Sequence, residues 1–179
     1  PLKITVKTAT SDGNWEARWE FYPRYATMTM LKKDHGYWFL YEGVPGGSLE
    51  AYDDFMYRSD GTRTLLWEPW AQDIAGEEWL YFSDPVLRRS LFVAHHEADD
   101  HADSYYNYND SMTVFGFGRT NEPFEALMTA TPQHFTVGFL GDTSFAVCRD
   151  SINSAYRPLA VTMGTPEQPG PDVPVLVSP

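Results

Sequence analysis

The sequence predicts an all-β protein, a two-layer antiparallel β-sandwich of the jelly-roll type with one short helix near residues 143–154. Three observations support this prediction. Apolar and polar residues alternate in many short segments, which is the pattern of half-buried strands. Glycine, proline and aspartate clusters separate these segments and are typical of turns. A single later segment has helical spacing instead.

The N-terminal part carries the clearest strand pattern. Residues 15–21 alternate between large apolar and charged side chains, and Pro23 ends this run because proline cannot donate to a strand ladder. Residues 26–30 alternate in the same way, and the segment 37–42 follows after a turn at Gly36. We expect these two segments to pair as a β-hairpin.

The later strands are shorter and regularly spaced along the chain. The segments expected to form them are 51–57, 64–67, 79–82, 87–95, 112–119, 124–129, 135–140 and 157–163. Gly116 and Gly118 share one face of the segment 112–119, which indicates close approach by a neighbouring chain segment or by a ligand.

The helix is predicted from the spacing of Phe145, Cys148 and Ile152, which lie on one face at about 3.6 residues per turn. Asp142 and Ser144 precede this segment and are suitable capping residues. Cys148 is the only cysteine, so an intrachain disulfide is excluded. On the apolar face of the helix it is expected to be a small buried residue.

We expect one sandwich domain over residues 1–164 and a proline-rich, semi-rigid linker over residues 165–179. A chain of 179 residues is long enough to bury a substantial core without disulfides or metals. The last residues, 174–179, resemble the opening strand of a fibronectin type III or immunoglobulin-like module. This resemblance implies that the domain is tethered to other domains in a longer chain.

The charge balance excludes several classes of partner. The chain has 13 Lys and Arg residues against 25 Asp and Glu residues, a net charge of −12. Such a charge repels phosphate backbones and anionic lipid, so we expect no nucleic-acid partner. Apolar runs are only a few residues long, so no membrane span is expected. The 6 Trp, 11 Tyr and 11 Phe residues exceed the needs of an ordinary core, and some are expected to face a ligand.

The window 95–110 concentrates carboxylates, histidines and tyrosines and contains no lysine or arginine. Carboxylates gathered without cations repel one another unless water or a metal ion stabilises them. Flexible oxygen ligands suit Ca²⁺, which binds about six to eight oxygens. We therefore expect Asp99, Asp100 and Asp103 to bind calcium, and a solvated acidic loop is the alternative.

The same window places Tyr105, Tyr106 and Tyr108 beside Asn107. Aromatic rings stack on the apolar faces of sugar rings, while amide groups match sugar hydroxyls as donors and acceptors. These residues predict a binding site for a neutral polysaccharide or oligosaccharide. The alternative is that one or two of the tyrosines fill the core.

Three further residues complete the predicted ligand-binding set. Trp67 and Trp70 flank Pro69, so at least one of the two rings is expected in an exposed loop. Arg119 follows the aromatic segment 112–119. Its alternative role is a structural ion pair with a carboxylate of a neighbouring strand.

An enzyme that cleaves polysaccharide, a glycoside hydrolase or a lyase, is the second hypothesis. A hydrolase needs two carboxyl groups about 5–10 Å apart. Glu42, Glu97 and His95 are the candidate acid–base residues. The sequence contains neither a G-x-S-x-G motif nor the strand motif of laminarinase-type hydrolases, so the binding hypothesis assigns no catalytic residue. A structural or adhesive surface domain is the third hypothesis.

The strand segments 15–21, 26–30, 37–42, 112–119 and 135–140, together with the aromatic and acidic window, resemble the concanavalin A-like jelly-roll class of carbohydrate-active domains. The resemblance implies a module of a secreted or cell-surface bacterial protein that acts on polysaccharide. It also implies calcium stabilisation and a tether to a catalytic or immunoglobulin-like partner. The missing carboxylate motif argues against hydrolysis.

Overall fold

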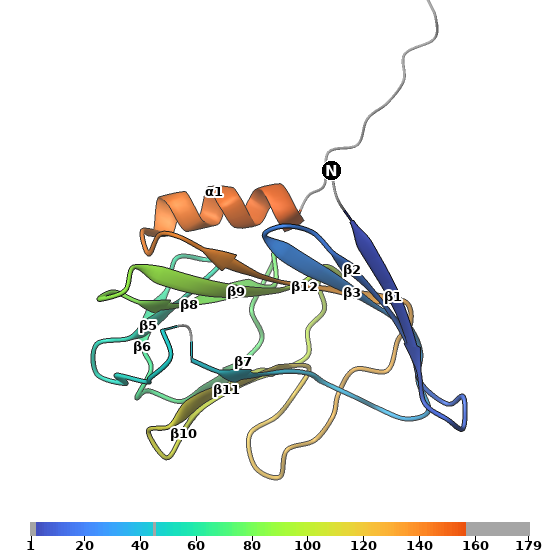
Figure 1. Ribbon diagram of the computed structural model, residues 1–179. Coiled ribbons are helices and arrows are strands. Elements are labelled where there is room, and N and C mark those ends of the chain that lie inside the picture. The colour runs from blue at the N-terminus through green and yellow to red at the C-terminus, as the bar shows by residue number, and fades with distance from the viewer. Residues whose placement is uncertain (1–2, 45, 157–179) are drawn as a thin grey trace, which may run out of the picture.

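The computed structural model describes residues 3–44 and 46–156, which form two antiparallel sheets and one helix (Figure 1). The predicted all-β, two-layer sandwich with one short helix is therefore confirmed. The expected strand 157–163 and the expected linker 165–179 lie outside the described residues. Within the described residues no helix is both long and apolar enough to span a membrane.

The large sheet has eight strands in the order β1-β2-β3-β12-β9-β8-β5-β6, all paired antiparallel. Its strands are β1 (Ile4–Ala9), β2 (Glu16–Phe21), β3 (Tyr25–Lys32), β12 (Gln133–Leu140), β9 (Arg89–His95), β8 (Trp79–Asp84), β5 (Phe55–Arg58) and β6 (Arg63–Leu65).

The small sheet has four antiparallel strands in the order β4-β11-β10-β7 and packs against one face of the large sheet (Figure 1). Its strands are β4 (Phe39–Gly43), β11 (Met112–Phe117), β10 (Asp103–Tyr108) and β7 (Trp70–Gln72). One face of this small sheet lies on the core, and the other faces away from the large sheet.

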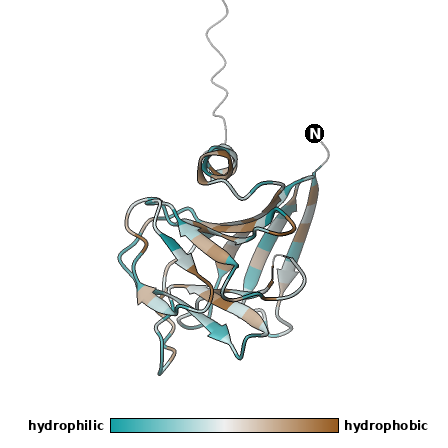
Figure 2. Ribbon diagram, turned by 90° about the vertical axis from the view of Figure 1, so that its left-hand side faces the viewer, coloured by the Kyte–Doolittle hydropathy of each residue, from teal (hydrophilic) through white to brown (hydrophobic). Residues whose placement is uncertain are grey.

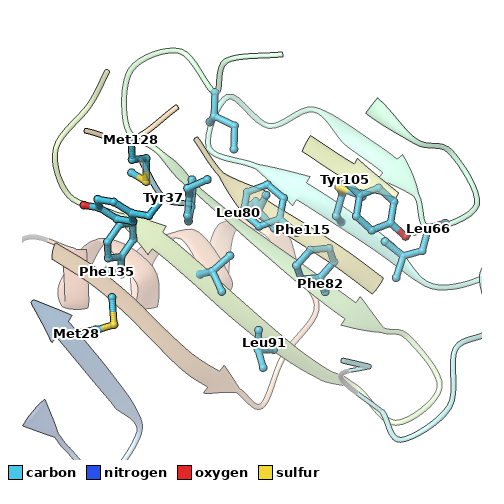
Figure 3. Close-up of a cluster of buried hydrophobic side chains, with 14 residues drawn as sticks. Met28, Tyr37, Leu66, Leu80, Phe82, Leu91, Tyr105, Phe115, Met128 and Phe135 are labelled. Carbon is cyan, nitrogen blue, oxygen red and sulfur yellow. Dashed lines mark hydrogen bonds between the residues drawn. The ribbon is translucent and has the colours of Figure 1, made fainter. Parts of the chain in front are cut away.

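The main core fills the space between the two sheets and is rich in aromatic rings (Figure 3). Strands with one buried face place every second side chain inward. Phe82 of β8 meets Tyr105 of β10 and Phe115 of β11, with ring centroids 5.8 and 6.2 Å apart. These contacts join the two layers, because they connect strands of different sheets.

A second, smaller core lies between the large sheet and helix α1 (Phe145–Tyr156), which covers the outer face of that sheet (Figure 2). The buried helix residues Cys148 and Ile152 pack there with Trp79 and Phe92. At the start of the helix, Asp142 Oδ1 accepts a 2.7 Å hydrogen bond from the backbone N–H of Ser144. The predicted helix and its capping segment are confirmed.

Two details of the predicted topology are wrong. The segments 26–30 and 37–42 do not form a hairpin, because β3 belongs to the large sheet and β4 to the small one. The intervening turn carries the chain from one layer to the other. Residues 124–129 form no named strand and contribute only isolated bridges, Arg119 with Ala126 and Tyr37 with Met128. Strands β1, β7 and β10 were not predicted.

Candidate functional site

The outward residues of the small sheet follow from its strand alternation. Phe115 and Phe117 of β11 lie in the core, so the intervening positions of that strand face outward. Val114 pairs directly with Tyr106 of β10, which places Tyr106 on this outer face. Tyr108 lies two residues further along the same strand and is 48% exposed. The outer face therefore presents tyrosine rings to solvent.

Arg119 lies among three aromatic rings on this face, and we call this group the arginine cage. The guanidinium carbon is 5.4 Å from the ring centroid of Trp38, 5.3 Å from that of Tyr106 and 4.3 Å from that of Phe124. Such distances are those of cation–π contacts, which stabilise a buried positive charge. The cage combines residues from β4's leading loop, from β10 and from the loop after β11.

The Arg119 side chain is only 5% exposed, yet it is not fully hydrogen-bonded. Its buried Nε and Nη1 atoms have no hydrogen-bond partner among the residues that the structure describes. Buried polar groups are nearly always paired, because an unpaired donor loses its hydrogen bonds to water without compensation. The cage therefore holds two buried donors that are left without an acceptor.

Gly116 makes room for the arginine. A Cβ atom at this position would lie 2.8 Å from Arg119 Cδ and 3.0 Å from Arg119 Cβ. The stem of the Arg119 side chain therefore passes directly over the backbone of β11. Both glycines singled out in the sequence have a close neighbour, because a Cβ atom at Gly118 would clash with Cγ of Met128.

Replacing Gly116 by alanine is expected to lower the free energy of unfolding by about 1–3 kcal/mol, because the added methyl group overpacks against Arg119. Urea unfolding measures this loss. Gly141→Ala is the matched control, since a Cβ there meets nothing within 4 Å. Equal stability of both variants would contradict the close packing.

Tyr105, Asn107 and Trp70 were predicted to contact a ligand, and the structure places them elsewhere. Tyr105 is 0% exposed and donates a 2.6 Å hydrogen bond to the Leu66 carbonyl, so its predicted contact with a ligand is wrong (Figure 3). At the β10–β11 turn, Asn107 donates a hydrogen bond from Nδ2 to Asp110 and accepts one at Oδ1 from the backbone N–H of Asp110. Trp70 packs against the core and donates from Nε1 to the sulfur of Met56.

Trp67 is exposed but does not belong to the arginine cage. Its ring is 46% exposed and stacks on Tyr52, which is 73% exposed, with ring centroids 6.1 Å apart. This pair forms a separate aromatic surface. Sequence reasoning missed Tyr52, as it missed the cage residues Trp38 and Phe124.

The three carboxylates predicted to bind calcium do not converge. Asp103 is buried and accepts hydrogen bonds from the backbone N–H groups of Ile74 and Gly118. Asp99 hydrogen-bonds to His101, and Asp100 is exposed. Among the described residues, the groups whose candidate ligand atoms lie within 4.8 Å of one another are Glu78, His95 and Asp99, and Glu50, Asp54 and Asp84.

His95, a candidate catalytic base, is buried between the sheets. One ring nitrogen bonds to Glu78 and the other lies 2.5 Å from Gln133 Oε1. Burial lowers the pKa of His95, but the hydrogen bond and charge of Glu78, with smaller contributions from Gln133 and Asp99, leave the pKa above its usual value. With 0% exposure, His95 cannot reach a polysaccharide in solution.

Of the other two candidate acid–base residues, Glu97 lies near His95, with 3.7 Å between its Oε2 and Nε2 of the histidine, but that histidine is buried. Glu97 binds His134, with a 2.5 Å distance between Oε1 and Nδ1. Glu42 pairs with Val114 and therefore faces outward on the small sheet, away from the core that contains His95. The enzyme hypothesis thus gains no support from this arrangement.

A groove of about 1010 Å³ lies between α1 and the β2–β3 turn. Apolar side chains such as Phe21, Tyr25, Phe139 and Val147 line it. None of the predicted site residues contributes to its lining.

No family model, no curated protein and no solved structure matches this chain. Because a fold hosts many activities, function has to be argued from the chemistry of the site itself.

Proposed function

We propose that this protein is a carbohydrate-binding domain that recognises a largely neutral polysaccharide on the outer face of the small sheet. The observation that carries the proposal is the arginine cage, in which Trp38, Tyr106 and Phe124 surround a guanidinium with unpaired donors. A sugar offers both an apolar ring face and hydroxyl acceptors, so it matches rings and N–H groups together.

The charge of the chain supports a mainly neutral ligand. A net charge of −12 repels densely charged polyanions over a distance set by the salt concentration. The proposal includes a secreted or cell-surface setting and a tether to further domains, and calcium is not required for the contacts that it uses.

Replacing Tyr106 by alanine tests the proposal. We expect roughly a tenfold to hundredfold loss of glycan affinity, because the lost ring covers apolar sugar surface. Affinity gel electrophoresis against soluble glucans, mannans, xylans and galactans, plain and acid-substituted, measures the change. The plain and the acid-substituted glycans are each tested with and without calcium.

Tyr52→Ala is the matched control, because Tyr52 is an exposed tyrosine outside the cage. We expect this variant to migrate like the original protein. A wild-type chain that none of the glycans retards would contradict the proposed function. Equal losses of glycan affinity in the two variants would contradict a binding site at the cage.

A further inference from the structure

Among residues 3–44 and 46–156, no carboxylate forms an ion pair with Arg119. A guanidinium remains charged at every pH at which the protein is folded. The residue is 5% exposed, and its Nε and Nη1 atoms lack partners among the described residues. Buried charges in proteins are normally paired with an opposite charge, because losing their hydration is costly.

The three rings of the cage stabilise the charge of Arg119 but do not pair its N–H donors. An aromatic face attracts the positive charge, but arginine carries five N–H donors and no acceptor. Trp38, Tyr106 and Phe124 hold the guanidinium without accepting hydrogen bonds from the two unpaired nitrogens. The missing element is an acceptor for these N–H groups, and a carboxylate supplies two acceptor oxygens together with a negative charge.

Phe124 covers the guanidinium from a loop that holds it in an unfavourable backbone conformation. Its φ angle is 59°, a left-handed value that bulky side chains rarely adopt. Backbone hydrogen bonds from Phe124 to Asn121 and from Thr120 to Glu125 keep the loop in this shape. In this conformation the centroid of the Phe124 ring lies 4.3 Å from the guanidinium carbon of Arg119. Because Nε and Nη1 of Arg119 are buried, a ligand reaches them only when a covering ring such as that of Phe124 moves aside.

We propose that Arg119 is a carboxylate-binding subsite, which receives an acidic group carried by an otherwise neutral glycan. This inference rests on the proposed function and specifies its ligand. Carboxylate is the class of acceptor that pairs bidentately with guanidinium and also neutralises it. The net charge of −12 restricts the ligand to isolated acidic groups, such as single uronate branches, because a dense polyanion is repelled.

The first experiment titrates the protein with glucuronate, acetate and glucose and follows the Nε–H resonance of Arg119 by ¹⁵N NMR. We expect glucuronate to shift this resonance strongly, acetate to shift it weakly and glucose to leave it in place. Arg119→Lys identifies the resonance. No shift with either carboxylate overturns the inference.

The second experiment compares an acid-substituted xylan with the same xylan after chemical reduction of its carboxyl groups. We expect reduction of the ligand, or Arg119→Lys and Arg119→Gln in the protein, to weaken binding roughly tenfold to a hundredfold, as for a charge-assisted hydrogen bond. Circular dichroism and urea unfolding establish that both variants fold.

The outcomes separate this inference from the proposed function. If both xylans bind equally and Tyr106→Ala weakens both, the carboxylate subsite is wrong and glycan binding holds. If glucuronate shifts the Arg119 resonance and no polysaccharide is retained, the subsite holds and the proposed polysaccharide binding is wrong.

Discussion

Replacing Glu78 by alanine is expected to lower the free energy of unfolding by about 3–5 kcal/mol, because it leaves the buried His95 without its carboxylate partner. The Glu78 and His95 side chains are 2% and 1% exposed. Glu78 also accepts a hydrogen bond of 2.5 Å from the backbone N–H of Asp99. The substitution therefore removes two buried contacts and opens a cavity. Urea unfolding measures the loss.

The loss is expected to be larger at pH 5.5 than at pH 8.5. In the original protein the pKa of His95 is raised, so its contribution is complete below the unfolded pKa and is lost as the pH rises through the folded value. Without Glu78, only the hydrogen bond to Gln133 and the charge of Asp99 oppose burial, so the pKa of His95 falls. Acid then favours the unfolded chain, in which the histidine can take up a proton.

Two further variants separate the charge of Glu78 from its shape and from a general effect of removing a carboxylate. Glu78→Gln keeps the shape and can donate to a neutral His95, so we expect it to cost less than Glu78→Ala and to weaken the pH dependence. Glu125→Ala removes an exposed carboxylate and is expected to change stability by less than about 0.5 kcal/mol. A loss at Glu78 as small as that at Glu125 would contradict a stabilising role for the pair.

The fold class was predictable because alternation reports directly on a half-buried sheet. The segments 15–21 and 26–30 show it, and they are the paired neighbours β2 and β3. Alternation does not predict which of the two sheets a strand belongs to. A short turn after residue 30 is compatible with a hairpin. In the structure β3 is paired with β2 on one edge and with β12 on the other, so no edge of β3 is left for β4.

Strand β10 was missed because its sequence is polar. Asp103 and Ser104 are buried at its start, where Asp103 accepts backbone hydrogen bonds and Ser104 lies near the Thr120 carbonyl. Burial of polar residues depends on partners that are distant in sequence. A window of acids and tyrosines therefore indicated a loop, although it contributes a strand to the small sheet.

Part of the candidate site was predictable from the chemistry of its side chains. Tyr106, Tyr108 and Arg119 were selected for their chemistry, and they do lie on one face. Trp38 and Phe124 complete the cage from segments far away in the sequence. The alternation that exposes Tyr106 also buries Tyr105, so the three tyrosines could not form one surface.

Stability is expected to fall as the pH rises from about 4 to about 8, because Asp103 holds a proton in the folded protein. Burial raises the pKa of Asp103 to about 8, and the hydrogen bonds from Gly118 and Ile74 offset only part of this effect. In the unfolded chain an aspartate loses its proton near pH 4. Between these two values the folded state binds more protons, so each pH unit costs up to about 1.4 kcal/mol.

Urea unfolding at pH 5, 6, 7 and 8 measures this slope, and Asp103→Asn is expected to reduce it. The amide has no such proton to lose, so its effect on stability changes little with pH. Burial also raises the pKa of Asp54 to about 6, so a weaker slope is expected to persist below that pH. Asp100→Asn is the control, because Asp100 is exposed in the same acidic segment. If Asp103→Asn and Asp100→Asn leave the same slope, then Asp103 is ionised in the folded protein, and its two backbone donors outweigh its burial.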